Sequence, residues 1–136
     1  VRLDDGLELE GAYVAVDGVL TSAKSAPGSV LRVTLLWAAS ETIQEDYTVF
    51  VHALDISGHP IAQHDGAPQA GDRPTSTWEV GETVVDAHEF MLPDVPDYEE
   101  VTITAGMYLS YTGDRLMTLD GNDSVIVAEL SVQGNS

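Results

Sequence analysis

Apolar and polar side chains alternate with a period of two through almost the whole chain, and this is the period of a β-strand. In residues 30–37 and 101–109 every second position is apolar, whereas intervening residues such as Arg32 and Thr102 are polar. The residues predicted to face inward are Leu31, Val33, Leu35, Trp37, Val101, Ile103, Ala105, Met107 and Leu109. Each segment is therefore expected to form a strand that turns one face to a core.

Four further segments have the composition of strands, at residues 7–16, 47–54, 83–92 and 125–132. Residues 47–54 are apolar on both faces over their middle, which indicates a strand in the centre of a sheet. Gly11 interrupts the first segment and predicts a β-bulge or a close backbone approach. In the last segment we expect the inward-facing side chains to be Ile126, Ala128, Leu130 and Val132.

Pairs of turn-forming residues separate these segments, among them Asp17-Gly18, Ser57-Gly58, Val80-Gly81 and Asp120-Gly121. No window has the 3.6-residue stripe of an amphipathic helix. About seven to eight strands separated in this way indicate an all-β fold, an antiparallel two-sheet sandwich of the immunoglobulin or fibronectin-III kind. We expect residues 1–136 to form one domain, because a chain of this length can bury a core by itself.

The chain carries 23 acidic residues against 5 basic ones, a formal net charge of -18. The basic residues are dispersed, at Arg2, Lys24, Arg32, Arg73 and Arg115. A phosphate backbone is bound by a clustered basic surface, so we expect neither nucleic acid nor anionic lipid as a partner. No apolar run approaches the ~20 residues that span a bilayer, and we expect no membrane insertion of this domain.

The chain begins at Val1 without a basic segment followed by an apolar stretch, so we expect it to be a piece of a larger protein. Cysteine is absent, which excludes disulfides and thiolate metal sites. The sequence contains no Gly-x-Ser-x-Gly nucleophile motif, dinucleotide fingerprint or phosphate-binding glycine loop. We therefore predict no catalytic residues, no cofactor and no enzymatic activity.

A family resemblance is carried by several segments in combination, and it covers about residues 25–132. These segments are residues 27–37, 46–55, 61–66, 73–78, 86–90, 106–108 and 112–116. They resemble the β-sandwich domain at the C-terminal end of Chloroflexi-type membrane glycosyltransferase-like and other envelope proteins. The resemblance implies a non-catalytic extracytoplasmic accessory domain of unknown molecular function. Its implied partner is a protein or glycan of the cell envelope, or the rest of its own parent chain.

The histidines are the first candidates for a site. His52 shares a strand face with Phe50 and Leu54, and His88 shares one with Asp86 and Phe90. Together with His64 and Asp65 they could converge on a metal or ligand if their strands were neighbours. A zinc site needs three or four converging ligands, and the chain lacks any recognised metal spacing. We therefore interpret the histidines as polar groups that satisfy their neighbours, and expect no metal there.

The loop at residues 65–81 holds two further candidates, Arg73 and Trp78. We expect Arg73 to pair with Asp65 and fix the loop, with binding of a carboxylate or phosphate ligand as the alternative. We expect Trp78 to close the end of the core, and Trp37 to lie inside it. The alternative for Trp78 is an exposed ring that stacks on a sugar, which would make the domain a carbohydrate-binding module using this loop.

A carboxylate-rich turn lies near the C-terminus and includes Asp120, Asn122 and Asp123. Calcium takes six to eight oxygen ligands, and a calcium site is the weak alternative for this turn. The twelve-residue calcium loop with its closing glutamate is absent, so we interpret the segment as a hairpin turn rich in Asp and Asn.

Overall fold

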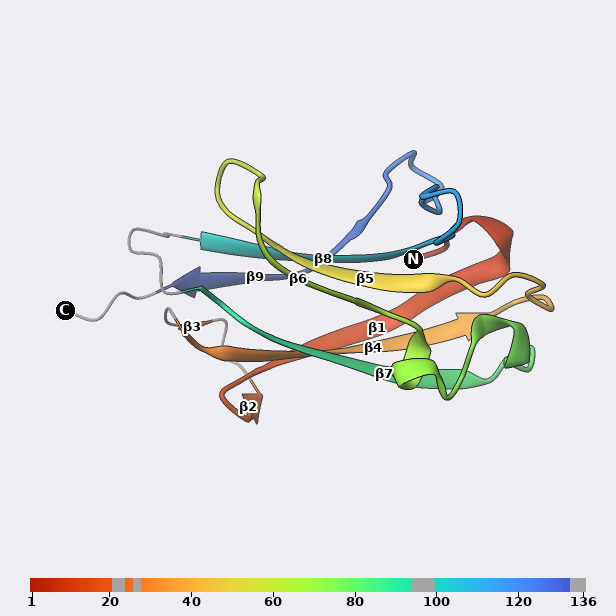
Figure 1. Cartoon of the computed structure of the whole chain (residues 1–136), viewed down its shortest axis with the longest axis horizontal. Coiled ribbons are helices and arrows are strands. Elements are labelled where there is room, and N and C mark those ends of the chain that lie inside the picture. The colour runs from red at the N-terminus through yellow and green to blue at the C-terminus, as the bar shows by residue number, and fades with distance from the viewer. Residues whose placement is uncertain (21–23, 26–27, 94–99, 133–136) are drawn as a thin grey trace.

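The computed structural model describes residues 1–20, 24–25, 28–93 and 100–132, which form two stacked β-sheets (Figure 1). The four-stranded sheet has the order β2-β1-β4-β7, with β1 at Leu7–Val16, β2 at Val19–Leu20, β4 at Val30–Ala39 and β7 at Thr83–Met91. The five-stranded sheet has the order β3-β9-β8-β5-β6, with β3 at Lys24–Ser25, β5 at Thr48–Leu54, β6 at Pro60–Gly66, β8 at Glu100–Tyr108 and β9 at Val125–Val132. Neighbouring strands are antiparallel apart from β3, which pairs parallel with β9. The predicted antiparallel two-sheet sandwich is confirmed.

The helical elements in the described part of the chain are three short 3₁₀ segments, η1 at Asp4–Gly6, η2 at Pro68–Gly71 and η3 at Thr75–Thr77. None of the helices in this part is long and apolar enough to cross a membrane. Pro27, which opens the first segment of the family resemblance, and the side chain of Val132 lie outside the described residues.

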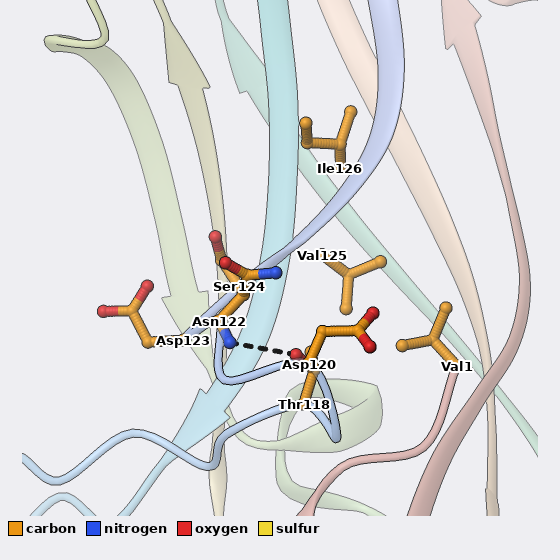
Figure 2. Close-up of a pocket in the computed structure, with 8 residues that line it drawn as sticks. All are labelled: Val1, Thr118, Asp120, Asn122, Asp123, Ser124, Val125 and Ile126. Atoms are coloured by element: carbon orange, nitrogen blue, oxygen red, sulfur yellow. Dashed lines mark hydrogen bonds between the residues drawn. The ribbon is translucent and has the colours of Figure 1, made fainter.

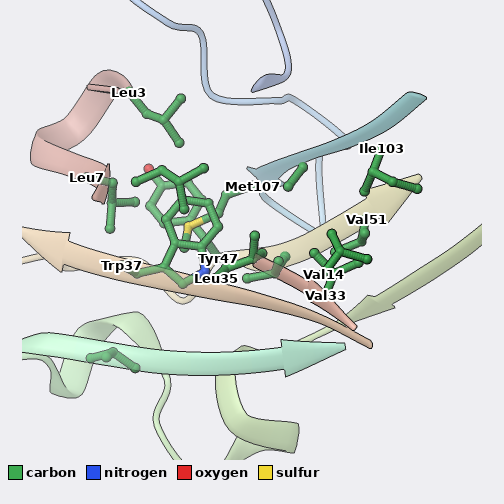
Figure 3. Close-up of a cluster of buried hydrophobic side chains, with 14 of the residues drawn as sticks. Leu3, Leu7, Val14, Val33, Leu35, Trp37, Tyr47, Val51, Ile103 and Met107 are labelled. Atoms are coloured by element: carbon green, nitrogen blue, oxygen red, sulfur yellow. The ribbon is translucent and has the colours of Figure 1, made fainter. Parts of the chain in front are cut away.

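The core lies between the sheets and has the predicted alternation on β4 and β8 (Figure 3). The fully buried residues of these two strands include Leu31, Val33, Leu35, Trp37, Val101, Ile103, Ala105 and Met107, all with an exposed fraction of 0%. Leu109, just beyond β8, is half-buried. Burying one aliphatic side chain of this kind stabilises a fold by about 1.5–3 kcal/mol, so these two strands supply much of the driving force for folding.

The other two backbone predictions also hold. β5 lies between β8 and β6, so the segment that is apolar on both faces is an interior strand. The pairing of β1 with β4 shifts between Leu9 and Gly11, which is the predicted bulge.

The predicted orientation of Ile126 is wrong. The pairing of β9 with β8 shifts register between Ile103 and Thr104, because β9 contains one extra residue at this point. Ala128 pairs with the inward-facing Ile103, whereas Ile126 pairs with Thr104 on the opposite face. The side chain of Ile126 is consequently 64% exposed.

Strands β6 and β7 face each other at one lateral edge of the sandwich, and the intervening segment carries η2 and η3 (Figure 1). Thr75, at the start of η3, is completely buried and fastens this segment to the start of β5. Its hydroxyl accepts a hydrogen bond from the backbone N–H of Tyr47 at 3.0 Å and donates to the carbonyl oxygen of Glu45. The segment therefore packs over the end of the core.

Candidate functional site

The five predicted histidine-site residues separate into two groups on opposite faces of the sheet that contains β5 and β6. His64 contacts His88, which in turn contacts Asp86, at the edge between the sheets. His52 and Asp65 lie together on the outer face of the five-stranded sheet. The strands do bring these residues near one another, but not to one common centre. In the described residues, no three His, Asp or Glu side chains are arranged to hold a metal ion.

The inner group is a chain of hydrogen bonds. Asp86 and His88 occupy the inward face of β7 and are 0% and 2% exposed. Nε2 of His88 lies 2.6 Å from Oδ2 of Asp86, and its Nδ1 lies 2.8 Å from Nδ1 of the more exposed His64 on β6. The backbone N–H of Gln69 donates to Oδ1 of Asp86 at 2.8 Å. A buried carboxylate thus has partners on both of its oxygens, as a buried charge requires.

The outer group is held by contacts within itself. Nε2 of His52 lies 3.9 Å from Oδ1 of Asp65, and the hydroxyl of Tyr108 donates to Oδ2 of the same carboxylate at 2.9 Å. Burial lowers the pKa of His52, with a contribution from Arg115, while Asp65 opposes this shift. Burial and the bond to Asp65 raise the pKa of Tyr108. Tyr108 and Asp65 thus share a hydrogen bond, and His52 lies close enough to the same carboxylate for an electrostatic contact.

The predicted partner of Arg73 is wrong. Arg73 makes a bidentate ion pair with Glu82, at 3.1 and 2.5 Å, and not with Asp65. Asp65 lies on the outer face of β6, where His52 and Tyr108 contact it, whereas Glu82 closes the same loop just before β7. Arg73 therefore does fix the loop, as expected, but through a different carboxylate.

Trp78 is 4% exposed, and its indole N–H donates to the carbonyl oxygen of Arg73 at 2.9 Å. A sugar needs an accessible ring face to stack on, and Trp78 presents none. The alternative of a carbohydrate site built on Trp78 is therefore ruled out in that form, whereas its interpretation as a plug at the end of the core agrees with the burial.

The carboxylate-rich turn lines a cavity of about 350 Å³ next to Val1 (Figure 2). The hydroxyl of Thr118 accepts a hydrogen bond from the backbone N–H of Asn122 at 3.0 Å, which is the expected turn geometry. The carboxylates of Asp120 and Asp123 point to opposite sides of the turn, and Asp123 pairs with Arg115 at 3.3 Å. The weak calcium alternative for these residues gains no support from this arrangement.

A further cleft, which the sequence did not reveal, lies on the outer face of the four-stranded sheet and has a volume of about 500 Å³. We call it the Tyr13 cleft. Its lining residues are Tyr13, Ala15, Gly18, Arg32, Thr34, Gln69, Ala70, Val85 and Ala87. Tyr13, Thr34 and Ala87 form one cross-strand row of the sheet. Tyr13 is 47% exposed, so its ring is accessible from solvent.

The wall of the Tyr13 cleft is an unusual turn at η2. Gln69 and Ala70 have φ values of 52° and 56°, and Gly71 has a φ of 94°. Non-glycine residues rarely adopt this left-handed backbone conformation, and each such residue stores of order 1–3 kcal/mol of strain. Backbone strain of this kind concentrates at binding and catalytic sites. Both Gln69 and Ala70 line the cleft, so the strained turn and the exposed ring belong to one feature.

No family model matches the chain, and no curated protein matches it. Among solved structures, the C-terminal domain of Wzt matches with a TM-score of 0.63 and 9% identity over 99% of this chain and 78% of that chain. The alkylpurine DNA glycosylase AlkC of Pseudomonas fluorescens, bound to DNA containing an abasic site analogue, matches with a TM-score of 0.55 and 12% identity. That match covers 94% of this chain and 30% of AlkC. At these identities the likeness is one of fold.

Proposed function

We propose that this domain is a non-catalytic accessory module of an extracytoplasmic cell-envelope protein and that it binds a glycan in the Tyr13 cleft. The observation that carries the proposal is the accessible ring of Tyr13 in a concave surface of about 500 Å³. Clefts of about 300–1,000 Å³ are typical of small-ligand sites. An aromatic face with a few polar neighbours is the combination that sugars use, since their C–H faces stack and their hydroxyls form hydrogen bonds.

The polar groups of the cleft suit a glycan. Arg32 is exposed and offers guanidinium donors, and its nearest carboxylate, Glu89, lies 3.7 Å away. The amide of Gln69 donates one hydrogen bond, to the carbonyl oxygen of Val85 at 2.8 Å. An amide has two donors and an acceptor oxygen, so it has further capacity for a hydroxyl. Four of the six remaining lining residues are Ala or Gly, which leave room above the sheet; the six are Ala15, Gly18, Thr34, Ala70, Val85 and Ala87.

The net charge of -18 narrows the ligand class. A strongly negative domain repels polyanions at long range, so we expect a neutral or amino-sugar glycan in preference to an acidic one. The same argument leads us to expect no DNA binding, although the AlkC structure, which shares the fold, contains DNA.

Two lines of support favour an accessory role. The sandwich recurs as one part of longer proteins. One matching structure is the C-terminal domain of Wzt, and the match to AlkC covers 30% of that protein. The chain of Asp86, His88 and His64 resembles a catalytic relay in connectivity, but none of the three cavities described for this structure is lined by these residues. The family resemblance adds the envelope location to the proposal.

The test is a titration of the ¹⁵N-labelled domain with neutral, amino-sugar and acidic envelope oligosaccharides, followed by ¹H–¹⁵N correlation spectra. Chemical-shift changes are expected only for amides of β1, β4, β7 and η2. The Tyr13→Ala variant should bind at least tenfold more weakly. The matched control is Tyr111→Ala, which removes another exposed tyrosine, 70% exposed, outside the cleft lining. Binding that shifts other strands, or that survives Tyr13→Ala, contradicts the proposed site.

A further inference from the structure

The strained turn that forms the wall of the Tyr13 cleft is bonded to the edge strand β7 through Gln69. The side-chain amide of Gln69 donates to the backbone carbonyl of Val85 at 2.8 Å, and its backbone N–H donates to the carboxylate of Asp86 at 2.8 Å. Val85 lines the outer cleft, whereas Asp86 is fully buried on the inner face. Gln69 therefore binds both the backbone of β7 and its inward-facing carboxylate.

Two left-handed residues in succession persist only if their surroundings fix them more strongly than the strain opposes them. Gln69 and Ala70 are such residues, with φ values of 52° and 56°. The carboxylate of Asp86 is the charged partner of this turn, and hydrogen bonds to ionised groups are roughly twice as strong as neutral ones. An ionised Asp86 would therefore hold Gln69 more strongly than the neutral carbonyl of Val85 does.

The histidine chain fixes the orientation of this carboxylate. With Asp86 ionised, the carboxylate only accepts, so the hydrogen at the 2.6 Å contact belongs to Nε2 of His88. In the tautomer of His88 that carries this hydrogen on Nε2 alone, Nδ1 is an acceptor, and the 2.8 Å contact then requires Nδ1 of His64 to donate to it. All donors of the chain thus point toward Asp86, and the chain ties the carboxylate to the five-stranded sheet.

The surroundings of Asp86 and His88 are apolar, whereas His64 at the other end of the chain is exposed. Val33 on β4 pairs with His88, and Val51 on β5 pairs with His64; both valines are 0% exposed. In a region of low dielectric constant, hydrogen bonds strengthen, and an unpaired member is costly. Removing the charge of Asp86 should therefore loosen the turn at Gln69 and Ala70.

We infer that Asp86 is a positioning residue for the Tyr13 cleft. From the inner face of β7 it holds the left-handed turn that forms the cleft wall on the outer face, with His88 and His64 orienting its carboxylate. This inference rests on the proposed function only for its consequence on ligand binding. The position of the turn in the ligand-free domain can be measured separately.

The experiment compares the ligand-free wild type with Asp86→Asn, using amide hydrogen exchange and imidazole ¹⁵N shifts. An asparagine can still accept from Gln69 with its oxygen, but its amide group must donate to Nε2 of His88. The hydrogen of His88 is then expected to move to Nδ1, and the exchange of the Gln69 amide to become about tenfold faster, with the exchange of Val51 unchanged. The control is Asp55→Asn, since Asp55 accepts from the backbone N–H groups of Ser57 and His59 in a remote turn.

A rescue variant separates positioning from general stability. Ala70→Gly in the Asp86→Asn background relieves part of the backbone strain. The exchange rate of the Gln69 amide should therefore recover at least half of the slowing that Asp86→Asn removed. A Gln69 amide that exchanges equally in wild type and Asp86→Asn overturns the inference. If Asp86→Asn does not fold, the wild type decides it: an Nε2 of His88 that carries no hydrogen, or an unprotected Gln69 amide, is the overturning result.

Ligand binding distinguishes this inference from the proposed function. For any neutral oligosaccharide that binds wild type in the Tyr13 cleft, Asp86→Asn should weaken binding about tenfold while Asp55→Asn leaves it unchanged. Unweakened binding in Asp86→Asn, with Tyr13→Ala still defective, overturns the role of Asp86 and keeps the cleft. Binding unaffected by Tyr13→Ala overturns the proposed function, while the ligand-free exchange of Gln69 still decides whether Asp86 positions the turn.

Discussion

The guanidinium of Arg115 lies 4.2 Å above the centre of the Phe50 ring, on the face of the five-stranded sheet that points away from the core. Phe50 is 1% exposed in spite of this orientation. The ring is enclosed by Arg115 and by Gly106, its cross-strand partner on β8. A small second cluster of packed side chains thus exists outside the sandwich, and Arg115 also ties it to Asp123 in the carboxylate-rich turn.

Gly106→Ala should destabilise the domain by about 1–3 kcal/mol, the usual cost of overpacking. A Cβ at this position would lie 2.5 Å from Cζ and 2.7 Å from Cε1 of Phe50, so the ring must move. Urea unfolding followed by circular dichroism measures the change. Gly11→Ala is the control, because its Cβ would meet its nearest atom at an ordinary 3.5 Å. Equal stability of the two variants would contradict the enclosed position of Phe50.

Thr75→Val should cost about 1–3 kcal/mol in unfolding free energy, because it leaves the buried backbone N–H of Tyr47 without its acceptor. Thr75→Ser keeps the hydroxyl and should recover most of the loss. The control is Thr77→Val, because the hydroxyl of Thr77 donates to the carbonyl oxygen of Pro74 at an exposed position. If Thr75→Val and Thr77→Val prove equally stable, Thr75 does not fasten the loop.

The ion pair of Arg73 and Glu82 should make stability fall in acid. The hydrogen bond from Arg73 lowers the pKa of Glu82 below its ordinary 4.5, so the folded state resists protonation of this carboxylate. The contribution is present above the unfolded-state pKa and is lost as the pH falls through the lower folded value. Glu82→Gln should therefore be less stable than wild type at neutral pH, and the two should become equally stable once the pH lies below the folded pKa of Glu82. A deficit that persists unchanged in acid would show that the loss has another cause.

His52 should contribute a second pH dependence in a different window. Burial lowers its pKa below the ordinary 6.5, so the unfolded state takes up protons first as the pH falls. Stability should decline as the pH falls below the ordinary value of 6.5 and should level off once the pH has passed the folded pKa, and His52→Gln should flatten that part of the profile. Unfolding free energies at half-unit pH steps would test this. A variant profile as steep as that of wild type would assign the decline to other groups.

The strands could be predicted from the sequence because the alternation of Leu31, Val33 and Leu35 is a local property of the chain. The same parity placed Asp86 and His88 on one face of β7. The contact with His64 could not be predicted, because it depends on β6 and β7 meeting at the edge of two different sheets.

The wrong predictions share a physical cause. Ile126 faces outward because of a bulge whose position is set by the pairing with the partner strand. Arg73 pairs with Glu82 because the path of the loop decides which carboxylate lies near the guanidinium. The Tyr13 cleft was missed because its wall needs left-handed backbone at Gln69 and Ala70, residue types that do not signal this conformation. The sequence does show that Tyr13 is an aromatic residue on a predicted strand, but not that a cleft surrounds it.

The burial of both indoles has a practical consequence for optical work on this protein. Trp37 is 0% exposed, and its N–H is the one buried side-chain nitrogen or oxygen of the described residues without a hydrogen-bond partner, while Trp78 is 4% exposed. Neither residue lines the Tyr13 cleft. Emission from the native fold should be blue-shifted and should move to the red only when the core opens, so fluorescence will report unfolding faithfully and will be nearly blind to a bound sugar.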